Sequence, residues 1–246
     1  NDPAPLLAQV NLLRADENWD AIEKKVADWL AEHPADTNPP VTVAASLVQT
    51  NSHQARKLAE ELLNRILQQD SDNPRALKHM AVLMQTTDRS PRAAEYYRKL
   101  LDIAPDDVIA MNNLAWILCT ERNEHQKALE LANRGLELAP DYIDLIDTRG
   151  TIYHKLGRYE LAIEDFNRCL ELYPENVPAA TSTHLNLARA LADSGRSEQA
   201  IASLERALEL NDENSALAPE QQQEAQTLLE KLKENEDVSA TATSRQ

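Results

Sequence analysis

The strongest constraint on the fold of this chain is an internal repeat, with steps of 34 to 38 residues from one unit to the next. The residue that marks each unit is alanine except in the first, and the markers are Ile22, Ala59, Ala93, Ala128, Ala162 and Ala200. A core residue follows each marker by four positions, one helical turn along the same face. Such a period is typical of a stack of units that bury their apolar faces against their neighbours.

Each unit is predicted to contain two helices joined by a turn. Apolar residues in Ala93–Ile103 are spaced by three and four positions, which is the period of a helix. Proline cannot continue a helix, because it lacks the backbone N–H. It follows the second helix of four units, at Pro34, Pro105, Pro140 and Pro174. With four glycines and ten aromatic residues in 246, the composition disfavours a β-sandwich or barrel, so the sequence predicts an all-α fold.

One unit carries the fullest set of repeat residues, with Gly150, Tyr153, Ala162, Phe166 and Pro174 in order. This pattern resembles the tetratricopeptide repeat (TPR) family, in its bacterial type. The resemblance implies a right-handed α-α superhelix, a TPR solenoid, of five to six repeats with a C-terminal capping helix. It also implies that small residues let paired helices approach closely. These structural positions are Ala81, Ala93, Ala115, Ala128, Gly150, Ala162, Ala188 and Ala200.

The repeat phase divides the chain into consecutive segments. A degenerate N-terminal repeat is predicted at 1–36, followed by repeats at 37–73, 74–107, 108–141, 142–180 and 181–214, a capping helix at 215–234 and a disordered tail at 235–246. The first repeat is degenerate because Ile22 replaces the small residue and Trp29 is bulky. The capping helix is expected to present a polar outer face, as the end of an open stack requires.

Charge and composition exclude several classes of partner. The formal net charge of −16 repels a phosphate backbone, so we expect no nucleic-acid partner. No apolar run approaches eighteen residues, and we expect no membrane insertion by this segment. For the same reason we expect a soluble domain, cytoplasmic or periplasmic. Because the chain opens at Asn1 and not at methionine, we expect it to be a fragment of a longer chain. Cys119 and Cys169 lie in predicted helices and resemble buried hydrophobes more than disulfide partners.

The sequence contains no recognisable catalytic or metal-binding motif. Its six histidines are scattered without the spacing of a metal site, and no phosphate-binding loop or nucleophile elbow occurs. We therefore expect no enzyme activity, no catalytic residues, no metal and no cofactor. A protein or peptide remains as the predicted class of partner, and self-association is left open.

The resemblance places the partner-binding groove on the inner side of the first helices. The groove residues that it implies are Lys78, His79, Asn112, Asn113, Trp116, Asp147, Thr151, His154, Asn186 and Arg189. Asn113 and Asn186 occupy the same repeat position, and resemble part of the asparagine ladder by which some members hold a peptide backbone. His79 and Thr148 interrupt this ladder. The alternative for Trp116 is packing against a neighbouring helix.

A second use known in the family is the carboxylate clamp that holds the acidic tails of chaperones. The corresponding positions here are Lys78, Val82, Asn113, Asp144 and Thr148. Two of the five match the clamp, and Asp144 inverts the charge. The sequence therefore predicts that this is not a chaperone carboxylate-clamp domain.

Three functions agree with these observations. The leading one is a non-catalytic protein–protein interaction scaffold that binds a peptide or helix of a partner in its concave groove. The second is a structural spacer or assembly arm of a larger protein of a bacterial envelope or exopolysaccharide system, which the run Asn112–Trp116 resembles. The third is a regulatory domain of an enzyme whose catalytic part lies outside this segment.

Overall fold

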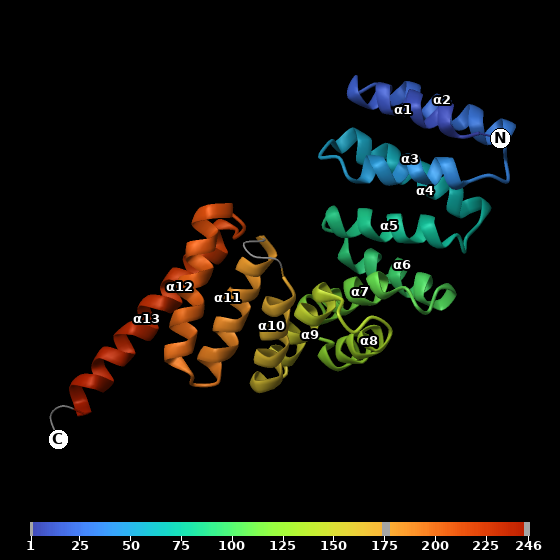
Figure 1. Cartoon of the computed structure of the whole chain (residues 1–246). Coiled ribbons are helices and arrows are strands. Elements are labelled where there is room, and N and C mark those ends of the chain that lie inside the picture. Colours follow the sequence, from blue (N-terminus) through green and yellow to red (C-terminus); the bar gives the residue numbers. More distant parts are fainter. Residues whose placement is uncertain (1, 174–177, 244–246) are drawn as a thin grey trace. The chain divides into compact units, whose positions relative to one another are not determined.

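The structure, a computed structural model, describes residues 2–173 and 178–243 and forms thirteen helices and no strand within them (Figure 1). The all-α fold class predicted from the repeat is therefore confirmed. The chain divides into two compact units, Asn1–Ile117 and Leu118–Gln246. None of the described helices is long and apolar enough to span a membrane.

The first unit contains six complete helices and most of a seventh. These are α1 (Ala4–Ala15), α2 (Trp19–Glu32), α3 (Asn38–Val48), α4 (His53–Gln69), α5 (Pro74–Thr86), α6 (Ser90–Ile103) and α7 (Val108–Thr120), which ends in the second unit. The second unit continues with α8 (His125–Leu138), α9 (Ile143–Lys155), α10 (Tyr159–Leu172), α11 (Pro178–Asp193), α12 (Ser197–Asn214) and α13 (Pro219–Thr243).

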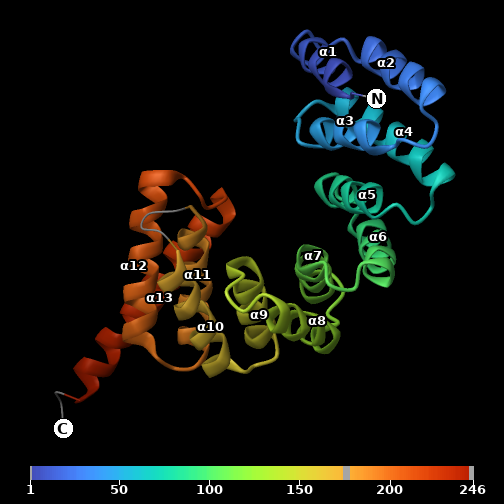
Figure 2. The ribbon, with the colours of Figure 1, turned by 45° about the vertical axis from the view of Figure 1, so that its right-hand side comes forward.

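Within each unit the helices pack in antiparallel pairs (Figure 2). The most extensive contacts join α5 to α6, α9 to α10 and α11 to α12, and each pair is a first and a second helix of one repeat. The first helix of one repeat also contacts the first helix of the next, since α3 contacts α5 and α9 contacts α11. The first helices therefore form a continuous layer inside each unit.

Local sequence explains where these helices begin and turn. Asn73 caps α5, since its side-chain oxygen accepts a hydrogen bond from the backbone N–H of Ala76 at 3.0 Å, and Pro74 occupies the first turn. In the turns between α9 and α10 and between α11 and α12, the chain passes through one residue with positive φ. Gly157 (φ 70°) and Gly195 (φ 83°) take this conformation without the steric penalty of a Cβ atom.

The small residues of the repeat lie in the core between paired helices. Ala81, Ala93, Ala115, Ala128, Ala162, Ala188 and Ala200 have no exposed surface. Gly150 is buried in α9. Both cysteines are buried and free, and burial raises the pKa of both thiols, that of Cys119 to about 11, so neither is poised as a nucleophile.

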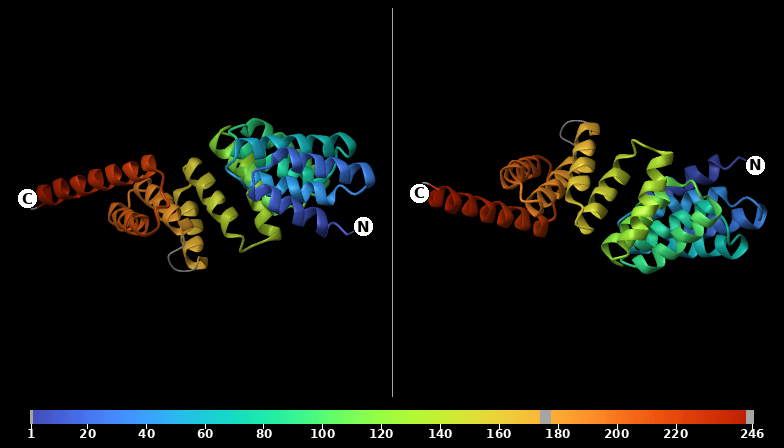
Figure 3. Two further views of the ribbon diagram at one scale, coloured as in Figure 1. Left: turned by 90° about the horizontal axis from the view of Figure 1, so that it is seen from above. Right: turned by 90° about the horizontal axis from the view of Figure 1, so that it is seen from below.

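Two predicted boundaries differ from the structure. α11 begins at Pro178, so the boundary placed between 180 and 181 falls inside a helix; proline at the first turn starts this helix earlier than the repeat phase indicates. α13 continues to Thr243, past the predicted end at 234 (Figure 3), because no proline or glycine interrupts the sequence there. The predicted disordered tail at 235–246 is thus helical to Thr243, and 244–246 lie outside the described residues.

Candidate functional site

In the first unit, the predicted groove residue Lys78 is engaged within the chain. Its Nζ contacts both carboxylate oxygens of Asp107 at 3.3 and 3.0 Å. Asp107 also accepts a hydrogen bond from the backbone N–H of Ala110 at 2.9 Å, at the start of α7. Lys78 therefore reinforces a helix cap, which is a structural use of a side chain that the sequence assigned to partner binding.

Asn113 takes part in a chain of hydrogen bonds inside the first unit. Its Nδ2 donates to the phenol oxygen of Tyr97 at 2.9 Å, and the Tyr97 hydroxyl donates to Oε1 of Gln85 at 3.0 Å. Burial raises the pKa of Tyr97 to about 12, so the phenol is neutral at physiological pH. Asn112 donates to Oδ1 of Asn113 at 3.4 Å. The Asn113 amide thus links α7 to α6 directly, and to α5 through the Tyr97 hydroxyl.

The two other predicted residues of this unit are Trp116 and His79. Trp116 is 38% exposed on α7. Burial, with the nearby charges of Arg75 and Lys78, lowers the pKa of His79, which keeps its imidazole neutral at pH 7.

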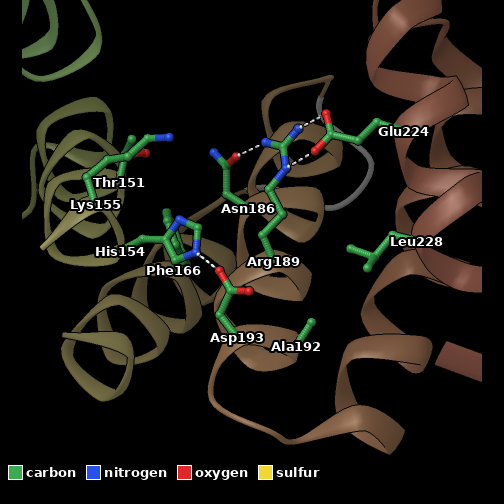
Figure 4. Close-up of a pocket in the computed structure, with 10 residues that line it drawn as sticks. All are labelled: Thr151, His154, Lys155, Phe166, Asn186, Arg189, Ala192, Asp193, Glu224 and Leu228. Carbon is green, nitrogen blue, oxygen red and sulfur yellow. Dashed lines mark hydrogen bonds and ion pairs between the residues drawn. The ribbon is translucent and has the colours of Figure 1, made fainter. Parts of the chain in front are cut away.

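The second unit brings four of the predicted residues together in one pocket of about 500 Å³ (Figure 4). The pocket is lined by Thr151, His154, Lys155, Phe166, Asn186, Arg189, Ala192, Asp193, Glu224 and Leu228. Thr151, His154, Asn186 and Arg189 are the residues that the sequence predicted. They lie on the first helices α9 and α11, and α13 forms the third wall.

Arg189 makes three hydrogen bonds in this pocket. Its Nε and Nη2 donate to the two carboxylate oxygens of Glu224 on α13 at 2.9 and 2.7 Å, and its Nη1 donates to Oδ1 of Asn186 at 2.9 Å. The guanidinium therefore joins α11 to α13 in a bidentate ion pair. The Asn186 amide nitrogen points away from Arg189 in Figure 4, and no described residue accepts a hydrogen bond from it.

A second polar contact crosses from α9 to α11. His154 Nε2 lies 2.8 Å from Oδ2 of Asp193, and the His154 ring lies 5.7 Å from the Tyr159 ring between centroids. The contact is an ion pair only when the imidazole is protonated. Beside it, the Thr151 hydroxyl oxygen is buried and has no hydrogen-bond partner among the described residues.

Asp147, which the resemblance assigned to the groove, makes its contact with α11. Its Oδ1 accepts a hydrogen bond from the Thr183 hydroxyl at 2.8 Å, so it joins α9 to α11 and does not line the pocket. Burial raises the pKa of Asp147 to about 6, and the carboxylates of Asp144 and Asp165 add to this shift against the effect of Thr183. The same Thr183 hydroxyl lies 3.2 Å from the Ala179 carbonyl oxygen, although its one proton can serve only one acceptor.

The sequence did not identify several residues of the pocket. Glu224 and Leu228 come from the capping helix, and Lys155, Ala192 and Asp193 come from the ends of α9 and α11. The polar composition of 219–234 indicated a capping helix, but no sequence signal showed which side chain would reach Arg189. Among the described residues, no group of three or more histidine, cysteine, aspartate or glutamate side chains could hold a metal ion.

Comparison with protein families gives two matches, which both carry the description tetratricopeptide repeat. One covers residues 81–143 and the other covers residues 143–213. Together they span more than half of the chain, and they include every helix that lines the pocket except α13.

Among curated proteins, the chain is similar to a UDP-N-acetylglucosamine–peptide N-acetylglucosaminyltransferase of Giardia intestinalis. The two are 34% identical over 107 residues, which are 44% of this chain and 7% of the transferase. The chain also spans less than two thirds of the length of two other curated relatives that it matches.

Two of the solved structures to which the chain is similar share its fold. YrrB, described as a TPR protein with an unusual peptide-binding site, superposes with a TM-score of 0.62 and 17% identity, over 77% of this chain and 94% of that one. PilW, described as a widely conserved type IV pilus biogenesis factor, gives a TM-score of 0.62 and 19% identity, over 79% of this chain and 92% of that one. Because the identities are this low, the superpositions demonstrate a shared fold and no more than that.

Proposed function

This chain belongs to the tetratricopeptide repeat family, and we propose on that premise that it binds an extended peptide segment of a partner protein in the pocket between α9, α11 and α13. Repeat stacks of this kind serve as protein–protein interaction scaffolds, because neighbouring repeats build an extended surface. The scaffold role follows from the family, and the pocket is the proposed point of contact.

The observation that supports the proposal is the meeting of Thr151, His154, Asn186 and Arg189 around one cavity (Figure 4). These four residues are among the ten that the resemblance to the TPR family assigned to a groove, and they come from two first helices that are adjacent in space. The cavity also has the mixed lining of a peptide site, since apolar Ala192 and Leu228 lie beside amide and charged groups.

We propose no catalytic role for this chain. TPR proteins are in general non-catalytic scaffolds, and the similar transferase is matched over only 7% of its length. The peptide-binding site named in the description of YrrB is a property of that protein, and its relevance here is that a protein of the same fold has such a site.

A peptide-binding measurement on the full chain tests this function. A synthetic library of short peptides is screened against the parent, and the tightest binders are measured by calorimetry against Asn186→Ala. Losing the amide should weaken binding several-fold, since an unmade hydrogen bond costs about 0.5–1.5 kcal/mol net. The matched control is Glu130→Ala with Glu164→Ala, two exposed carboxylates on the second helices α8 and α10.

The result that contradicts the proposal is equally direct. If Asn186→Ala binds every selected peptide as tightly as the parent, and changes on α8 and α10 abolish binding, the pocket is not the site. The spacer or assembly-arm function then replaces peptide binding in this pocket.

A further inference from the structure

Most of the unpaired polar groups of the pocket can donate a hydrogen bond, and they include the buried hydroxyl of Thr151. The Lys155 ammonium and the Asn186 amide nitrogen have no hydrogen-bond acceptor among the described residues, and Figure 4 shows them on facing sides of the pocket. The acceptors present are mostly engaged, since Glu224 binds Arg189 and one oxygen of Asp193 binds His154. A ligand group that complements this pocket is therefore an acceptor.

Glu224 shows how the pocket holds a carboxylate. Its two oxygens receive the parallel N–H groups of Arg189, which is the geometry in which a guanidinium recognises a carboxylate. The Glu224 side chain is nevertheless 53% exposed, and an ion pair of that exposure contributes little to stability. A carboxylate from another molecule can therefore replace Glu224 at small energetic cost.

Resting on the proposed function, we infer that the bound peptide carries a carboxylate that takes the place of Glu224 on Arg189, within reach of the Asn186 amide and the Lys155 ammonium. The C-terminal helix α13 is then an internal competitor, whose Glu224 occupies the subsite when no partner is bound. An apolar residue next to the carboxylate would pack on Ala192 and Leu228, which line the same pocket.

The overall charge of the chain does not override this local preference. The net charge of −16 repels an acidic peptide at a distance. At physiological ionic strength, however, interactions between exposed charges fall off beyond about 8 Å. Arg189 and Lys155 act at contact distance, where their charges determine which group is held.

The carboxylate can come from an aspartate or glutamate side chain or from the C-terminus of the partner, and the experiment separates these sources. Peptides selected from the library are remade with each acidic residue changed to its amide, and separately with an amidated C-terminus. Replacement of the bound carboxylate should weaken binding by about ten-fold or more, and the peptide arm that loses affinity identifies the source.

The decisive variant is Glu224→Gln, which removes the internal competitor and keeps its size. It should bind the carboxylate peptide about two- to five-fold more tightly, because an exposed ion pair no longer has to be broken. A gain of affinity cannot arise from misfolding. The matched control is Glu205→Gln, which breaks the ion pair of Glu205 with Lys233 between α12 and α13 at 2.8 Å and leaves Arg189 paired. It should bind as the parent does.

Three outcomes overturn the inference. If the selected peptides lose affinity in Asn186→Ala but not when their carboxylates are replaced, peptide binding stands and the carboxylate subsite is wrong. If Glu205→Gln gives the same gain as Glu224→Gln, loosening of α13 explains the gain and competition does not. If no peptide binds in a way that depends on Asn186, the proposed function and this inference both fail.

Discussion

A Cβ atom built on Gly150 would lie 2.7 Å from Cε1 and 2.9 Å from Cδ1 of Phe166, well inside van der Waals contact. Gly150 is on α9 and Phe166 is on α10, so the absence of a side chain is what allows these two helices to pack with the ring between them. The repeat phase predicted a small residue here, and the structure identifies the group that requires it.

Gly150→Leu should accordingly be among the most destabilising single changes in the second unit. We expect a loss of about 2–3 kcal/mol in the free energy of unfolding, because the new side chain must displace a ring that is itself buried. Urea unfolding followed by circular dichroism measures this loss. Glu137→Gln, at an exposed position of α8, should change stability by less than about 0.5 kcal/mol, and equal midpoints for the two variants would refute the packing argument.

The Asp147 carboxylate should make stability depend on pH. Its folded-state pKa of about 6 lies above the ordinary value of 3.8, so its contribution to stability is fully present below about pH 4 and is lost as the pH rises through 6. When protonated, Asp147 can donate to the Thr183 oxygen while Thr183 donates to the Ala179 carbonyl, and all three groups are satisfied.

Asp147→Asn should remove this dependence. Since one pKa unit corresponds to about 1.4 kcal/mol, the variant should be more stable than the parent by about 1–3 kcal/mol at pH 7.5 and nearly equal to it at pH 4. Urea unfolding of both proteins at the two pH values tests this. A variant that is less stable than the parent at pH 7.5 would show that the ionised carboxylate is favourable in the fold.

The hydrogen bonds of the Tyr97 hydroxyl should contribute more to the stability of the fold than the hydroxyl of the partly buried Tyr96 does. Tyr97→Phe leaves the Asn113 amide and the Gln85 carbonyl without their partner, at a cost of about 1–2 kcal/mol in stability. Tyr96→Phe on the same helix α6, where the side chain is only partly buried, is the control and should be nearly silent. Thermal unfolding distinguishes the two, and equal melting temperatures would contradict a structural role for Asn113.

The ion pair between Arg149 and Asp165 should be costly to break from one side. Arg149 Nε and Nη2 donate to the two Asp165 oxygens at 2.8 and 2.7 Å, and the Asp165 side chain is only 7% exposed. Arg149→Met leaves a buried carboxylate without its partner, and we expect a loss of about 3–5 kcal/mol.

Two further variants complete this test. Adding Asp165→Leu to Arg149→Met should recover much of the lost stability, because the unpaired charge is gone. Lys57→Ala, which breaks the exposed pair with Glu61, should cost less than about 1 kcal/mol. A double variant that is no more stable than Arg149→Met would mean that packing, and not the buried charge, sets the cost.

The sequence by itself determined the helical fold, the phase of the repeats and the burial of the small residues. These features are local, since the spacing of apolar residues and the positions of proline and glycine are read within one or two turns of a helix. For this reason Ala162, Phe166 and Gly150 could be placed in the core from the chain alone, and Thr151 and Asn186 could be assigned to one side of the stack.

Only the tertiary structure decided which polar groups meet. Arg189 binds Glu224, His154 binds Asp193, and Asp147 binds Thr183, in pairs separated by 35 to 39 residues. Each pairing depends on the angle between helices and on side-chain rotamers, which helical periodicity does not encode. The resemblance of the sequence to the repeat family located four residues of the candidate site, and helix packing determined that α13 supplies a carboxylate to it.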